Sequence, residues 1–126
     1  MSYKLIGNGL SVSSKKEVEG IFAAIHTVQD VIKLIKGTGN EAAEGKICWV
    51  EQAGATTLGP ILSRISGVVC QTGSSGSHIA IVSREYEIPA LMSCVIEGDL
   101  DALNGKKVKI RTVENSNRGE LLLWEE

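Results

Sequence analysis

The sequence predicts an α/β fold with a mixed sheet, a barrel-like core and flanking helices. Two patterns predict it. Apolar strand-like segments alternate with segments of helical spacing through the middle of the chain, and strands joined by a short turn follow near its end. The 126 residues suffice for one ordinary domain and leave no room for two. We therefore expect a single domain over residues 1–126.

The expected strands are short runs rich in β-branched and other apolar residues. They span Tyr3–Val12, Val18–Ile25, Lys46–Gln52, Gly67–Cys70, Pro89–Val95, Val108–Val113 and Glu120–Trp124. Glycines predict an irregularity in the first strand and, at Gly20, a bulge in the second.

The first expected helix is marked at both ends. Thr27 and Asp30 resemble a capping pair, apolar residues then recur at helical spacing, and Lys36 and Gly37 supply the cation and the glycine typical of a helix end. The other expected helices run from Thr56 or Thr57 to Ile65, from His78 to about Tyr86, and over Asp99–Leu103.

Composition and charge exclude several classes of function. Thirteen basic and fifteen acidic residues give a net charge of −2, so no basic face for nucleic acid is expected. The apolar runs are far shorter than a membrane span of about 20 residues, and the start lacks the features of a secretory signal. We expect a cytoplasmic protein that binds neither nucleic acid nor a membrane.

The pattern of the cysteines predicts buried, reduced thiols. Cys48, Cys70 and Cys94 are odd in number and each lies in an apolar, strand-like stretch, which fits buried thiols better than a disulfide framework. No ligand spacing typical of a metal site occurs, so we expect no metal site in this chain.

The loop before the expected helix at His78 carries the chemistry. Six small residues precede the histidine, and backbone N–H groups in such a loop can approach an anion closely. They are Thr72, Gly73, Ser74, Ser75, Gly76 and Ser77. A histidine at a helix N-terminus should stay neutral and nucleophilic, because the positive end of the helix dipole disfavours imidazolium. The alternative is that His78 has no chemical role and is a helix cap or a surface residue.

The stretch GVVCQTGSSGSHIAIVSREYEIPALM, residues 67–92, resembles the mobile domain of the phosphoenolpyruvate-utilising enzymes, the family of pyruvate phosphate dikinase and phosphoenolpyruvate synthase. The resemblance is carried by Gly67, Val68, Val69, Gly73, Ser77, His78, Ala80, Ile81, Val82, Arg84, Glu85, Ile88, Pro89 and Ala90. It extends over about residues 40–125 and implies the swivelling β/β/α phosphohistidine domain.

The resemblance implies a phosphocarrier. In that family the histidine at the position of His78 accepts a phosphoryl group, and the domain swings between a nucleotide-binding site and a site for pyruvate or another small acceptor. Thr72, Gly73, Ser74, Ser75, Gly76 and Ser77 would then contact the phosphate. Arg84 could reach back to the phosphate or tie its helix to the sheet. Departures from the family pattern occur at Cys70, Ser74, Gly76 and Ser93, where threonine, glycine, threonine and glycine are usual.

This chain lacks a Walker loop and a recognisable carboxylate pair, so we expect it to bind no cofactor of its own. Mg²⁺ and ATP or phosphoenolpyruvate are expected on partner domains. The start at Met1 favours a separate subunit that works in trans with a nucleotide-binding and an acceptor-binding subunit, and the alternative is a domain taken from a longer protein. Two alternatives stay open: a non-catalytic adaptor that binds a small anion or a partner protein, and a purely structural interaction domain. His26 is expected to be structural.

Overall fold

The computed structural model describes residues 2–11, 17–37, 44–51, 61, 64–73, 78–113 and 117–125. Its strands are β1 (Ser2–Ser11), β2 (Glu17–Ala24), β3 (Lys46–Val50), β4 (Gly67–Cys70), β5 (Ala90–Ile96), β6 (Lys107–Thr112) and β7 (Arg118–Glu125). Its helices are α1 (Val28–Lys36), α2 (His78–Glu85) and the short α3 (Leu100–Leu103). None of these helices has the length and apolar character needed to cross a bilayer.

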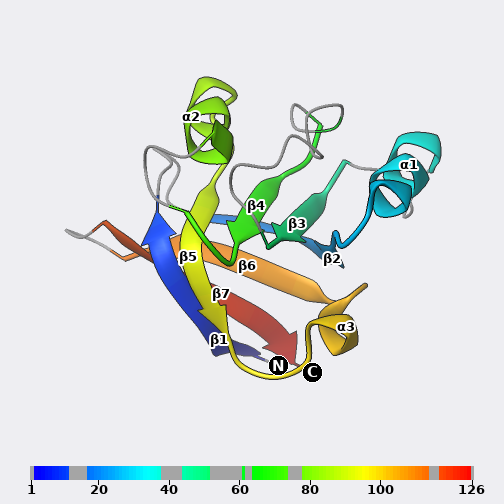
Figure 1. Ribbon diagram of the computed structural model, residues 1–126. Coiled ribbons are helices and arrows are strands. Elements are labelled where there is room, and N and C mark those ends of the chain that lie inside the picture. The colour runs from blue at the N-terminus through cyan, green and yellow to red at the C-terminus, as the bar shows by residue number, and fades with distance from the viewer. Residues whose placement is uncertain are drawn as a thin grey trace.

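The strands close into a barrel in the order β1-β5-β4-β3-β2-β6-β7. Strands β2, β3, β4 and β5 pair with one another in parallel. The pairs β5–β1, β1–β7, β7–β6 and β6–β2 are antiparallel. The expected mixed sheet and barrel-like core are therefore confirmed. Figure 1 shows α1 and α2 on the side of the parallel strands, with β1, β6 and β7 on the other side.

The side chains of the parallel strands alternate between two apolar cores. One core fills the space between these strands and the helices, and includes Cys48, Val68, Cys70, Ile79 and Ala80. The other fills the barrel itself, where residues such as Phe22, Ile47, Trp49, Val69 and Leu121 meet. Both faces of β3 and β4 are consequently buried, which explains why these segments read as continuous apolar runs.

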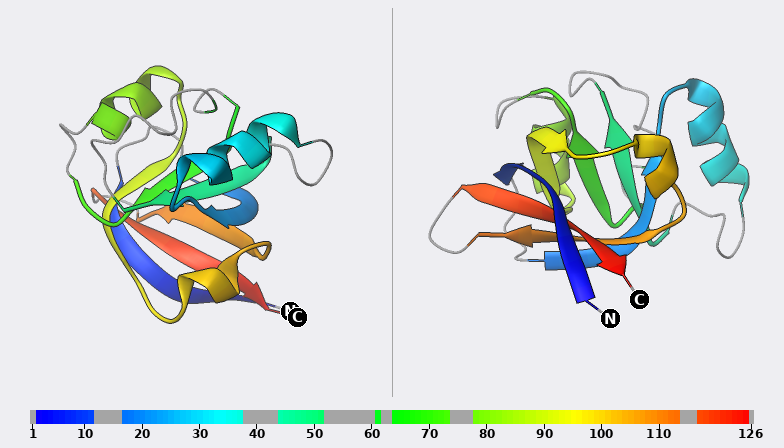
Figure 2. Two further views of the ribbon diagram at one scale, coloured as in Figure 1. Left: turned by 45° about the vertical axis from the view of Figure 1, so that its right-hand side comes forward. Right: turned by 90° about the horizontal axis from the view of Figure 1, so that it is seen from below.

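Strand β1 closes the barrel because it pairs with β7 along one edge and with β5 along the other. The register shifts between Leu5 and Gly7 against β7, and between Asn8 and Leu10 against β5. The irregularity expected from the glycines of this strand is therefore confirmed. The pairing of Ser2 with Glu125 also brings the two ends of the described chain together, as both views in Figure 2 show.

The bulge expected at Gly20 is wrong. Gly20 pairs with Val108 in an unbroken antiparallel register. A Cβ atom at this position would lie 2.7 Å from the carbonyl oxygen of Gly45, so a glycine here permits the close approach of the turn before β3.

Most other expected elements are confirmed with ends that differ by one or two residues. The Asp30 carboxylate accepts a hydrogen bond from the Thr27 backbone N–H, as the expected capping pair requires. The helix expected from Thr56 or Thr57 lies largely outside the described residues. At its described end, the N–H groups of Arg64 and Ile65 donate to the carbonyl of Ile61.

Candidate functional site

His78 is the first residue of α2, and α2 follows the carboxyl end of β4. The sequence places a small-residue loop between these two elements, and the structure puts the start of the helix where the sequence predicts it. Of the loop residues expected to contact phosphate, Ser74, Ser75, Gly76 and Ser77 lie outside the described residues. Thr72 and Gly73, at the beginning of the loop, are described.

Thr72 fastens the loop to the end of β3. Its hydroxyl donates to the carbonyl oxygen of Glu51 at 2.8 Å, and its backbone N–H donates to the same oxygen at 3.2 Å. A threonine hydroxyl has one proton to donate. The expected donation from Thr72 to a phosphate would therefore require this bond to break, and in the present structure Thr72 is an anchor of the loop.

Gly73 continues the loop in a conformation that suits glycine. Its φ is 104°, a value that side-chain-bearing residues rarely adopt. Its carbonyl oxygen accepts a hydrogen bond of 2.6 Å from the hydroxyl of Ser93 on β5. The first residues of the loop are thus held from two sides, by the end of β3 and by β5.

Ser93 and Glu51 contribute to this site, although neither is among the site residues that the sequence predicts. Ser93 occupies the irregular part of β5, where the register with β1 shifts, and its φ is 49°. The sequence held one signal, because the related family commonly has glycine here and glycine tolerates positive φ. A serine at the same position retains the conformation and adds a hydroxyl that reaches Gly73.

Helix α2 presents one apolar face to the parallel strands. Ile79, Ala80 and Ser83 are buried, whereas Ile81 and Glu85 are exposed. This amphipathic pattern fixes the rotation of the helix about its axis and hence the side on which each helical position lies.

Arg84 lies exposed in the last turn of α2. It lies six positions after His78, which corresponds to about 9 Å along the axis of an α-helix. Contact between Arg84 and a group on His78 would therefore depend on the full reach of the arginine side chain.

His26 lies on a different part of the same sheet edge. Its backbone N–H donates to the Asp30 carboxylate at 2.9 Å, and its ring packs against Trp49 with a centroid separation of 5.4 Å. Both contacts tie the end of β2 to α1 and β3. They agree with the structural role expected for His26.

The three thiols are poor nucleophiles in this fold. Cys48, Cys70 and Cys94 are all buried and free, as the sequence predicts. Burial raises the pKa of each thiol to about 12, because a thiolate would lose its hydration. Among the residues that the structure describes, no three histidine, cysteine or acidic side chains gather where a metal ion could bind.

A comparison with protein families matches residues 42–108 to the family described as "PEP-utilising enzyme, mobile domain". The matched segment covers just over half of the chain and includes β3, β4, the loop, α2 and β5. His78 and every loop residue considered above fall inside it. A comparison with curated protein sequences found no significant match.

Among solved structures, the chain is similar to the microcin C7 self-immunity protein MccF. The wild-type apo form is 15% identical and the complex with glutamyl sulfamoyl guanosine 14% identical; each comparison covers 94% of this chain and 41% of MccF, with a TM-score of 0.50. An MccF-like protein from Bacillus anthracis str. Ames is 15% identical over 93% of this chain and 43% of its own, with a TM-score of 0.48. The chain thus spans less than half of these proteins, and the likeness to MccF concerns the fold alone.

Proposed function

Because the chain belongs to the mobile-domain family of PEP-utilising enzymes, we propose that it is a phosphoryl carrier and that His78 is the residue that carries the group. The observation on which the proposal rests is the position of His78 at the N-terminus of α2, inside the segment matched to the family. In this proposal the domain has the swivelling β/β/α arrangement and works in the cytoplasm.

The start of α2 suits a histidine that must alternate between a neutral ring and a phosphorylated one. Free N–H groups and the positive end of the helix dipole favour negative charge at this point and disfavour imidazolium. A neutral ring keeps a nucleophilic nitrogen. Such dipole contacts are worth only about 0.3–1 kcal/mol at an exposed site, so they favour the phosphorylated form without trapping it.

The surroundings of α2 support access by a second protein. By helical periodicity, position 78 belongs to the same side of the helix as positions 81, 82 and 85, of which Val82 is partly buried against the core. Ile81 and Glu85 at the other two positions are exposed. An exposed helix side next to the proposed phosphoryl site would let a partner enzyme approach the histidine.

The anchored beginning of the loop supports a role in holding the phosphoryl group. Thr72 and Gly73 are fixed by Glu51 and Ser93, so the segment that follows starts from a defined point on the sheet. We propose that backbone N–H groups of Ser74, Ser75, Gly76 and Ser77 surround the phosphoryl oxygens, as small residues permit. Arg84 is proposed to support the phosphoryl group by reaching back along α2 with its side chain.

The proposed reaction has two half-reactions. A ring nitrogen of His78 attacks the phosphorus of the donor, a nitrogen–phosphorus bond forms, and the bond from phosphorus to the leaving oxygen breaks. After the domain moves, an acceptor oxygen attacks the same phosphorus and the nitrogen–phosphorus bond breaks, which restores the neutral ring. Mg²⁺ and ATP belong to the nucleotide-binding partner, and pyruvate, phosphoenolpyruvate or another small organic molecule belongs to the acceptor-binding partner.

The test uses the chain together with its partner subunits and ³²P-labelled donor. Wild-type chain should acquire label that is stable to alkali and labile to acid, as phosphohistidine is, and should lose it when acceptor is added. His78→Ala should acquire none. His26→Ala is the matched control, because it removes the other histidine and should label as wild type does. Label that persists in His78→Ala would refute the assignment.

A further inference from the structure

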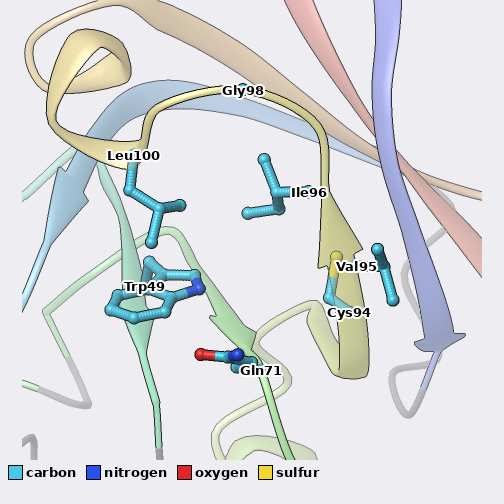
Figure 3. Close-up of a pocket in the computed structure, with 7 residues that line it drawn as sticks. All are labelled: Trp49, Gln71, Cys94, Val95, Ile96, Gly98 and Leu100. Atoms are coloured by element: carbon cyan, nitrogen blue, oxygen red, sulfur yellow. The ribbon is translucent and has the colours of Figure 1, made fainter.

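A pocket of about 330 Å³ opens at the carboxyl ends of the parallel strands, inside the mouth of the barrel. Ligands of α/β sheets commonly bind at this edge. Figure 3 shows the side chains around it. The lining comes from β3, from the residue after β4, from β5, and from α3 and the connection that precedes it. It consists chiefly of Trp49, Gln71, Cys94, Ile96, Gly98 and Leu100.

The lining side chains carry no charge. Ile96 and Leu100 supply apolar surface beside the Trp49 indole, and the indole nitrogen lies on the side of the ring that faces Ile96 (Figure 3). The Gln71 amide adds one donor group and one acceptor. The Cys94 thiol is neutral near pH 7, because burial raises its pKa to about 12.

Acidic residues adjoin the lining segments. Glu51 comes directly after β3, and Glu97 and Asp99 flank Gly98; all three are exposed. These three carboxylates outnumber the Arg118 guanidinium, which acts on the Cys94 thiol, so together the charges make the approach of an anion unfavourable. The pocket therefore differs from the proposed phosphoryl site, where a helix N-terminus favours negative charge.

We propose that this pocket binds a small uncharged organic molecule with a planar ring and an amide or hydroxyl group. The ring would pack between the Trp49 indole and the apolar side chains of Ile96 and Leu100, where aromatic contact and apolar burial both favour it. The amide or hydroxyl would pair with the Gln71 side chain. The volume lies at the lower end of the range for small-molecule sites and is sufficient for one substituted ring.

The site is physically linked to the loop before His78 but does not depend on phosphoryl transfer. Gln71 directly precedes Thr72, and Cys94 directly follows Ser93, so the pocket borders both anchors of the loop. A ligand here would contact the segment that leads to the histidine. Binding can be measured with the isolated chain in the absence of any phosphoryl donor, so its failure and that of the carrier proposal are separate results.

The test is an NMR titration of the ¹⁵N-labelled full-length chain with benzamide, and with benzoate as the anionic molecule of the same shape. The chain has two tryptophans, so two indole N–H signals report on two places. Benzamide should shift the Trp49 signal to saturation and leave that of Trp124, on β7, unchanged. Benzoate should bind at least about tenfold more weakly, because it is charged.

Variants locate the binding further. Gln71→Ala should weaken benzamide binding about fivefold to tenfold, the effect of one neutral hydrogen bond. Gln29→Ala, at an exposed position of α1, is the matched control and should bind as wild type does. The proposal is overturned if the Trp49 signal does not saturate, if Trp124 shifts equally, if benzoate binds as well as benzamide, or if Gln71→Ala has no effect.

Discussion

Ser93 joins two features of the site in one residue. Its backbone has a φ of 49°, and its hydroxyl donates to the Gly73 carbonyl at 2.6 Å. The positive φ is a cost that glycine would not incur, whereas the hydrogen bond is a gain that only the serine hydroxyl supplies. The loop before His78 is thus stabilised by a side chain in a strained position on another strand.

Replacement of Ser93 separates these two effects. Ser93→Ala keeps the strain and loses the hydrogen bond, so the free energy of unfolding should fall by about 1–1.5 kcal/mol. Ser93→Gly also loses the bond but relieves the strain, so it should be less destabilising than alanine. Urea unfolding of the two variants checks this order. An alanine variant as stable as wild type would contradict the assigned role of the hydroxyl.

The elements of the site meet at the carboxyl edge of the parallel strands. β2 leads to His26 and α1, β3 leads to Glu51, and β4 leads to Thr72 and the loop before α2. α1 begins four positions after the end of β2, whereas residues 71–77 separate the end of β4 from the start of α2. The position of His78 is therefore set by the order of β4 and α2 along the chain.

The start of α1 has a pH dependence that can be measured. Burial of the Asp30 carboxyl opposes its ionisation, but the N–H groups of His26 and Thr27 that donate to it outweigh burial and lower its pKa below the usual 3.8. Because the folded-state pKa is lowered, this contribution to stability is complete above about pH 3.8 and is lost as the pH falls through the folded value.

Asp30→Ala should lower the free energy of unfolding at pH 7 by about 1 kcal/mol, a typical value for a helix cap. The difference from wild type should shrink as the pH falls below 3.8. Glu85→Ala, in the exposed last turn of α2, is the control and should change stability by less than about 0.5 kcal/mol. Urea unfolding at neutral and acidic pH measures both, and a difference independent of pH would contradict the cap assignment.

At the scale of the whole molecule, the sequence predicts the individual strands and helices better than the closure of the strands into a barrel. Strands such as Gly67–Cys70 are evident because both of their faces are apolar, and the ends of α1 are marked by Asp30 and Gly37. The pairing of β1 with both β5 and β7 joins segments about 80 to 120 positions apart, which local patterns do not encode. Gly20 was misassigned for the same reason, since its close neighbour, Gly45, belongs to another element.

The candidate site also has features that the sequence predicts and features that it does not. The small-residue loop, the helix start and the position of His78 follow from adjacent residues, so the sequence predicts them. The anchoring of Thr72 to Glu51 and of Gly73 to Ser93 depends on neighbours about 20 residues away along the chain. Only the assembled sheet brings these groups together.

The central claim is that His78 forms and releases a bond to phosphorus, and intact-mass measurement tests it most directly. After incubation with donor and partner subunits, the wild-type chain should gain the mass of one phosphoryl group, and tandem fragmentation should place that group on His78. Addition of acceptor should remove it. An unchanged mass in the presence of active partners, or an added phosphoryl group on any other residue, would contradict the account.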